Sequence, residues 1–266
     1  MKNASVQDMQ SKPNFGLQLY TLRDDLKNDF EGTIRAVAQM GYEFIETTGF
    51  MGEHSPVMKR LLQDTGLKIA GLGFDLNTLE HEPQQVIDAC REWNAHYAVT
   101  FWIDESQRQS ADDWKHIAER FNRIGESLAS GGVPFLYHLH GYEFVAYNGK
   151  RAIDILMEHT DPRYFNLEPD TYWVEYGGVD AAQFCTQYAD RIRALHLKDY
   201  ISKPEMHDIE VGEGAIDMHT ILKLALQHGW QWLIIEQERY HRTPVESAAR
   251  CLQNVKRMLQ ALQAGS

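Results

Sequence analysis

Short apolar runs alternate with longer segments of helical periodicity along the whole chain. Each run spans about five or six residues that are almost continuously apolar, which is typical of parallel strands covered on both faces. The eight runs begin near Phe15, Tyr42, Leu67, Tyr97, Pro134, Tyr164, Ile192 and Trp232. The pattern predicts a strand in each run.

The segments between the runs have the spacing of amphipathic helices. In residues 30–40, Phe30, Ile34 and Val37 share one face, and Gly41 follows as a helix stop. Helices are likewise predicted over residues 112–128, 216–227 and 245–262.

Eight strands that alternate with helices, with no linker or change of composition, predict one closed parallel barrel. The 266 residues are a normal length for a single (β/α)8 TIM barrel spanning residues 1–266, of which residues 1–13 are expected to form a flexible N-terminal arm. The alternative is a doubly wound open sheet, but no G-x-G-x-x-G follows the first strand. The longest stretch without a predicted element is 200–214, where barrel loops often contribute to the active site.

Composition narrows the class of protein. Apolar residues make up 43% and charged residues 24%, a balance typical of soluble globular proteins. No apolar run approaches the ~20 residues of a membrane span, and the first residues lack the apolar core of a secretory signal, so we expect a cytoplasmic protein without a membrane partner. The net charge of −12 argues against a nucleic-acid partner. Cys90, Cys185 and Cys251 are far apart and are expected to be reduced core thiols.

Polar residues occupy the ends of several predicted strands, where a buried strand should be apolar. In a barrel these ends carry the active site. Side chains two positions apart on a strand point to the same face, so each pair within the later strands can reach the barrel mouth. The residues are His138 and His140, Asp170, His196 and Lys198, Glu236 and Glu238, with Gln18, Glu46 and Asp104 from earlier strands.

Asp170, His196 and Glu236 form a set of potential metal ligands from three successive strands. Two carboxylates and an imidazole suit one divalent ion, Mn²⁺, Mg²⁺, Co²⁺, Fe²⁺ or Zn²⁺, without selecting among them. The alternative for the HLKD run is a structural salt bridge that involves Lys198 and Asp199.

The order of several motifs resembles the xylose-isomerase-like TIM-barrel superfamily, in particular the sugar phosphate isomerase/epimerase group that includes inosose dehydratase. The resemblance covers nearly the whole chain. The segments that carry it are GLQLYTLRD (16–24), YHLHGYEF (137–144), DTYWVEYGGVD (170–180), HLKD (196–199), GEG (212–214) and IIEQE (234–238).

The resemblance implies a metal held by Glu, Asp, His and Glu from strands five to eight. Asp170, His196 and Glu236 match the last three, whereas His138 stands at the first Glu position, with Glu143 as a competing fourth ligand. The related endonuclease IV branch has further zinc-binding histidines, one of them where this chain has Trp173, so a DNA-repair nuclease is not expected.

The resemblance and the strand-end residues together predict a metal-dependent isomerase or epimerase that acts on a free or keto sugar through an enediolate. A dehydratase or lyase acting on an inosose or 3-keto-glycoside is the alternative, and a non-catalytic sugar-binding barrel is a third hypothesis. No phosphate-binding loop beyond GEG is evident, so the substrate is expected to lack a phosphate. Barrels of this kind often dimerise, so a homodimer is also an expectation.

Individual roles follow from these hypotheses. Glu143 and His140 are the candidate bases, with Glu236 as a third, and Lys198 would stabilise negative charge or form an ion pair with Glu238. The candidate substrate-binding residues are Trp102, Trp173, His207 and Glu238.

Overall fold

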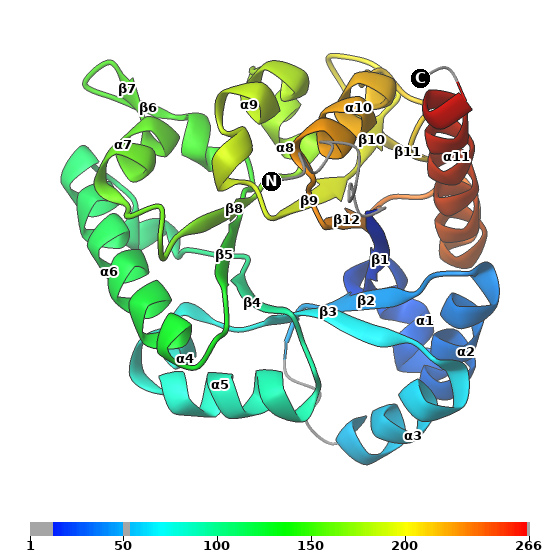
Figure 1. The fold of residues 1–266 in the computed structure, drawn as a ribbon. Helices are drawn as coiled ribbons and strands as arrows, with labels where there is room; N and C mark the ends of the chain where they lie inside the picture. Colours follow the sequence, from blue (N-terminus) through cyan, green and yellow to red (C-terminus); the bar gives the residue numbers. More distant parts are fainter. Residues whose placement is uncertain (1–12, 50–53, 265–266) are drawn as a thin grey trace, which may run out of the picture.

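The computed structural model describes residues 13–49 and 54–264, so the predicted N-terminal arm falls outside the described residues except for Pro13. Parallel strands surround the centre of the molecule and helices form a layer around them (Figure 1). The strands of the barrel are β1 (Asn14–Gln18), β2 (Phe44–Thr47), β3 (Lys68–Gly73), β4 (Tyr97–Thr100), β5 (Phe135–His138), β8 (Asn166–Glu168), β9 (Ala194–Leu197) and β12 (Trp232–Ile235).

The sheet closes on itself, as the sequence predicts. Neighbouring strands follow the order β8-β5-β4-β3-β2-β1-β12-β9, and every pair is parallel. Parallel bridges Leu167–Ile192 and Asp170–His196 join β8 to β9. The N–H of His196 also donates to the carbonyl of Pro169 at 2.9 Å. The open-sheet alternative is therefore wrong, and the fold is a (β/α)8 barrel.

The outer layer contains the predicted helices. They are α1 (Arg23–Asn28), α2 (Phe30–Met40), α3 (Ser55–Thr65), α4 (Leu76–His81), α5 (Pro83–Glu92), α6 (Ala111–Ser130), α7 (Ala152–His159), α8 (Thr171–Tyr176), α9 (Ala181–Gln187), α10 (Met218–His228) and α11 (Pro244–Ala264). Short 3-10 turns are η1 (Leu19–Leu22), η3 (Glu105–Gln107), η4 (Tyr142–Phe144) and η5 (Ala189–Arg191).

Helix boundaries follow the local signals. Gly41 ends α2 in the left-handed conformation, with φ of 92°. Thr243 and Glu246 form a capping box at the start of α11. The Thr243 hydroxyl accepts a hydrogen bond from the Glu246 N–H, and the Glu246 carboxylate accepts one from the Thr243 N–H.

The stretch 200–214, for which no element is predicted, contains part of a small antiparallel ribbon. Its strands are β10 (Asp199–Tyr200) and β11 (Asp208–Ile209), and a similar ribbon, β6 (Ala146–Tyr147) with β7 (Lys150–Arg151), follows β5. Strands of two residues are too short to produce an alternating pattern, which is why the sequence does not reveal them.

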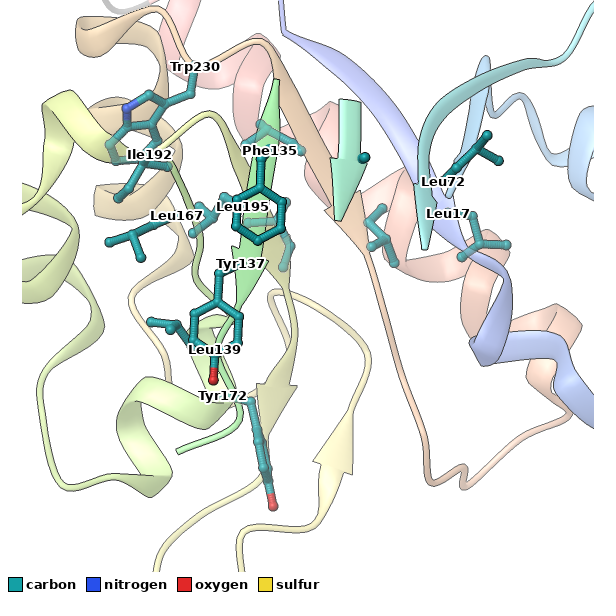
Figure 2. Close-up of a cluster of buried hydrophobic side chains, with 14 of the residues drawn as sticks. Leu17, Leu72, Phe135, Tyr137, Leu139, Leu167, Tyr172, Ile192, Leu195 and Trp230 are labelled. Atoms are coloured by element: carbon teal, nitrogen blue, oxygen red, sulfur yellow. The ribbon is translucent and has the colours of Figure 1, made fainter. Parts of the chain in front are cut away.

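Successive side chains along each strand point alternately to the helix layer and to the barrel interior, and each direction has its own hydrophobic cluster. Phe135, Tyr137 and Leu139 follow one another along β5 and pack toward the helices (Figure 2). Leu136, between them, belongs to a separate cluster inside the barrel, with Val99 and Ile234. The next inward position on β5 is His138, so the same alternation that builds the core brings a polar side chain to the centre.

The three cysteines are buried and free, as expected from their spacing. No helix in residues 13–49 or 54–264 combines the length and the apolar character needed to cross a bilayer.

Candidate metal centre

Four strand-end side chains converge inside the barrel near its C-terminal end. One nitrogen or oxygen atom of each lies within 4.8 Å of the corresponding atoms of the others, and all four side chains are buried. They are His138, Asp170, His196 and Glu236. The structure thus brings together the three residues of the predicted ligand set and His138.

Asp170 links this group to the start of α8. Its Oδ1 accepts hydrogen bonds from the N–H groups of Tyr172 and Trp173 at 2.8 and 3.1 Å. Its Oδ2 is buried and has no hydrogen-bond partner among the described residues. Burial, reinforced by the charge of Glu236, raises the pKa of Asp170 to about 7, although Lys198 acts in the opposite direction.

His196 lies between two carboxylates. Its Nδ1 is 2.9 Å from Glu236 Oε2, and its Nε2 is 2.8 Å from Glu46 Oε2. Burial lowers the pKa of His196, but Glu168 and Glu46 outweigh it and hold that pKa well above the ordinary value. For Glu236, burial is outweighed by Lys198 and His196, which lower its pKa to about 2. The carboxylates of Glu46 and Glu236 therefore strongly favour a positive charge between them.

His138 stands beside His196, with 4.3 Å between the ring centroids. Its Nδ1 is 3.4 Å from Glu168 Oε2, and no hydrogen bond of standard geometry reaches this nitrogen in the described part of the chain. Burial, together with the neighbouring imidazoles, holds the pKa of His138 well below its ordinary value, so the ring is neutral and can act as a ligand.

Lys198 is buried next to the group, and its ammonium donates a hydrogen bond to Glu238. Burial lowers the pKa of Lys198, but Glu236, Asp170 and Glu238 outweigh it, so the side chain stays charged. The ion pair with Glu238 is thus confirmed, whereas Asp199 takes no part in it. Asp199 instead accepts hydrogen bonds from backbone N–H groups, among them those of Gly212 and Gly214.

A cavity of about 450 Å³ opens above the four grouped side chains. Its lining is mostly aromatic and imidazole, with two carboxylates at one side. The lining residues are Gln18, Tyr20, Thr48, Phe101, Trp102, His138, His140, Tyr142, Trp173, Glu236 and Glu238. The size and the mixture of apolar walls with few polar groups are typical of a small-molecule site.

His140 is one of the predicted bases and lies on the cavity wall. Its Nδ1 is buried without a hydrogen-bond partner among the described residues. Burial lowers the pKa of His140 to about 4, although Glu236 acts in the opposite direction, so the ring is neutral near pH 7.

Two predicted site residues lie neither on this cavity wall nor in the buried group of four with its neighbour Lys198. Glu143 is fully buried and accepts hydrogen bonds from the Tyr137 hydroxyl and, at 3.1 Å, from the His140 N–H, so both its oxygens point away from the lining. Burial raises the pKa of Glu143 to about 7, against the effect of the Tyr137 hydrogen bond. His207 is exposed on the loop between β10 and β11 and is not part of the lining.

Several residues around the group have no assigned role in the sequence analysis. The sequence analysis names Glu46 only as a polar residue of an early strand and does not name Glu168. Glu168 precedes Asp170 by two positions and therefore points to the same inward face of the strand. Asp208 is buried on β11, where its Oδ2 lies 4.0 Å from the Lys198 ammonium and accepts a hydrogen bond from the Glu238 N–H at 2.8 Å. Nothing in the local sequence pattern marks it.

The group fits a divalent ion by a free ligand atom and by its charge. Asp170 Oδ2 is buried without a hydrogen-bond partner in the described chain. Four carboxylates, those of Glu46, Glu168, Asp170 and Glu236, are buried in and around the group, whereas Lys198 is the one lysine or arginine buried within the described residues. Imidazole nitrogen and carboxylate oxygen are the donors that divalent transition metals take in proteins.

A second cavity of similar volume lies at the opposite end of the barrel, lined by the first residues of several strands. None of the four grouped side chains lines it. Because barrel enzymes carry their active sites at the C-terminal strand ends, the cavity above His138 and Glu236 is the candidate site.

The fold and the site define the class: a (β/α)8 barrel with a buried cluster of carboxylates and imidazoles below a small-molecule cavity at the C-terminal strand ends. The chain belongs to the family of xylose isomerase-like TIM barrels, which it matches over residues 34–258. This match confirms the family resemblance seen in the motifs.

Individual relatives are sugar-processing enzymes. The chain is 25% identical to the inosose dehydratase of Geobacillus kaustophilus over 246 residues, covering 76% of this chain and 78% of the relative. It is similar in fold to a sugar phosphate isomerase/epimerase from Parabacteroides distasonis, with a TM-score of 0.80, 22% identity and coverage of 96% and 98% of the two chains. The IolI protein, solved with a bound zinc atom, has a TM-score of 0.69, 16% identity and coverage of 93% and 98%.

Proposed function

We propose that this chain is a divalent-metal-dependent sugar isomerase or epimerase. The observation that carries the proposal is the convergence of His138, Asp170, His196 and Glu236 within 4.8 Å, next to a cavity of about 450 Å³. The reaction would remove a proton from the carbon beside a carbonyl group and return it at another position, through an enediolate.

The four grouped residues would hold one divalent ion, and Mn²⁺, Mg²⁺, Co²⁺, Fe²⁺ and Zn²⁺ all accept these donors. When bound, such an ion supplies Lewis-acid polarisation of a carbonyl oxygen. His138 is favoured over Glu143 as the fourth ligand, since both oxygens of Glu143 already accept hydrogen bonds outside the group.

His140 is the residue best placed to move the proton. It lies on the cavity wall and is neutral near pH 7. Glu143 acts behind it by holding the His140 backbone N–H. Glu236 is the alternative base, because it also lines the cavity and is ionised.

The other cavity residues would bind the sugar. The rings of Trp102 and Trp173 offer apolar faces to its C–H groups, and Glu238, held by Lys198, can accept a hydroxyl hydrogen bond. No lysine or arginine occurs among the described residues that line the cavity. A phosphate would lack a counter-charge there, which supports an uncharged sugar.

Dehydration is the second candidate function. It shares the first step, but the intermediate would then lose a β-hydroxyl group. The similarity to inosose dehydratases, at 25% identity, favours this alternative and extends the substrate class to cyclic polyol ketones.

The test is a panel of uncharged ketoses and inososes incubated in D₂O with metal-loaded and EDTA-treated protein. We expect deuterium to enter the substrate at the carbon beside the carbonyl only with metal. An isomer or epimer as product would support the first function, and a dehydrated product the second. Turnover that is unaffected by complete metal removal would contradict both. Sugar binding with neither deuterium uptake nor any product across the panel would also contradict both and would leave a sugar-binding barrel.

A further inference from the structure

Beneath the four grouped side chains lies a second layer of polar residues inside the barrel. Glu46 and Glu168 come from β2 and β8, and neither side chain has any exposed surface. Both carboxylates lie beside histidines of the candidate metal centre. Burying two carboxylates in a barrel interior is costly, so their contacts need a physical reason.

Glu46 is fixed from three directions. Its Oε1 accepts a hydrogen bond from the Tyr97 hydroxyl at 2.5 Å, and its Oε2 accepts one from Gln18 Nε2 at 2.6 Å. The same Oε2 lies 2.8 Å from His196 Nε2. A carboxylate only accepts hydrogen bonds, so the contact with Glu46 holds an imidazole hydrogen on Nε2 and leaves Nδ1 as the nitrogen that can give up its hydrogen to bind an ion.

Nδ1 of His196 faces the metal centre, because it lies 2.9 Å from Glu236 Oε2. Glu168 has the equivalent place beside His138, as the two residues are direct partners across β5 and β8. Its Oε2 is 3.4 Å from His138 Nδ1 and 3.5 Å from His196 Nε2.

We propose that Glu46 and Glu168 are positioning residues for the two histidine ligands, an inference that rests on the proposed function. Glu46 holds the Nε2–H of His196 so that Nδ1 binds the ion. The charge of Glu168, whose Oε2 lies 3.4 Å from His138 Nδ1, favours the hydrogen on Nδ1, so that Nε2 binds the ion. The two imidazoles are thus fixed in opposite tautomers by carboxylates from outside the ligand set.

A second ion between Glu46, Glu168 and His196 is the competing explanation, since donor atoms of these three residues also lie within 4.8 Å of one another. The contacts of Glu46 argue against it. Tyr97 and Gln18 both direct hydrogen atoms at its oxygens, which are the atoms that would have to bind the ion. The orientation of these donors therefore favours a positioning role.

The test compares wild type, Glu46→Gln and Glu168→Gln by titration calorimetry with Co²⁺ or Zn²⁺, by the visible spectrum of the Co²⁺ protein and by histidine ¹⁵N NMR. A glutamine offers one acceptor oxygen, so one of the donors around residue 46 would meet an amide N–H₂. Glu210→Gln is the matched control, because Glu210 is also fully buried but contacts Ser247 and Arg242 elsewhere. Should Glu46→Gln not fold, Tyr97→Phe removes one hydrogen bond from Glu46 and keeps the ring.

We expect one ion per wild-type chain and an affinity about 10- to 100-fold weaker in each glutamine variant, with the control unchanged. NMR of the Zn²⁺-loaded protein should show His196 as the Nε2–H and His138 as the Nδ1–H tautomer, and Glu46→Gln or Tyr97→Phe should alter the His196 signals and the Co²⁺ spectrum. Equal affinities with unchanged spectra would overturn this inference alone, and two ions per chain would replace it with a second metal site. If the wild-type protein binds no ion, both the proposed function and the positioning role of Glu46 and Glu168 are rejected.

Discussion

The two carboxylate oxygens of Asp170 have different roles: one stabilises the start of a helix, and the other is available to a metal ion. Its Oδ1 caps α8, whereas its Oδ2 has no partner in the described chain. Asparagine can keep the cap through its own Oδ1 but replaces the second oxygen with an N–H₂ group that cannot bind a cation. We expect Asp170→Asn to keep its fold, by circular dichroism, and to lose metal affinity by at least about 100-fold, by calorimetry.

Asp104→Asn is the control for this substitution, because Asp104 also follows a strand but is exposed and caps the short turn η3. Its metal affinity should equal that of the wild type. Equal affinity in Asp170→Asn would instead exclude Asp170 from the ligand set.

Glu143 gives a pH-dependent prediction. Burial raises its pKa to about 7 in the folded protein, so between about pH 4.5 and 7 the folded state holds a proton that the unfolded state releases. The contribution of this carboxyl group to stability is present at low pH and is lost as pH rises through 7. The glutamine in Glu143→Gln cannot ionise. The free energy of unfolding of the variant, relative to that of the wild type, should therefore increase by an amount on the order of 3 kcal/mol between pH 5 and pH 8.

Urea unfolding of both proteins across this pH range measures the difference. Parallel pH profiles would show that Glu143 titrates normally and that burial does not control its charge.

At the scale of elements, Asp199 organises the segment after β9. Its two oxygens accept hydrogen bonds from the backbone N–H groups of Tyr200, Gly212, Gly214 and Ile216 at 2.9 to 3.1 Å. Asp199→Ala would leave these donors without their acceptor, and we expect a loss of about 3 kcal/mol in the free energy of unfolding. Denaturant unfolding checks this, with the exposed Glu205→Ala of the same loop as the control. A loss below about 0.5 kcal/mol would show that water replaces Asp199.

The strands and the longer helices could be predicted because each has a period that follows from burial. Residues 30–40 form α2 as predicted, and inward alternation along β5 places His138 and His140 together. The role of Asp208 on β11 could not be predicted, because Asp208 reaches the site through a tertiary contact with the Glu238 N–H. The orientation of Glu143 could not be predicted for a related reason: η4 turns its side chain toward Tyr137 instead of the cavity.

At the scale of the whole molecule, the candidate metal centre joins strands from both halves of the barrel. Its four residues come from β5, β9 and the segments directly after β8 and β12, and β8 meets β9 where the barrel closes. An ion that binds only the folded state stabilises it by about 2.7 kcal/mol at 100 times its dissociation constant. For a chain of this size we expect the Tm to rise by roughly 5 to 10 °C in scanning calorimetry. An increase of the same size in Asp170→Asn would show that the ion acts elsewhere.

The position of the ion tests the central claim most directly. Anomalous diffraction from crystals grown with Mn²⁺ should show one strong peak in each chain, within bonding distance of His138, Asp170, His196 and Glu236. The absence of a peak at full Mn²⁺ saturation, or a peak bound by other residues, would contradict the account.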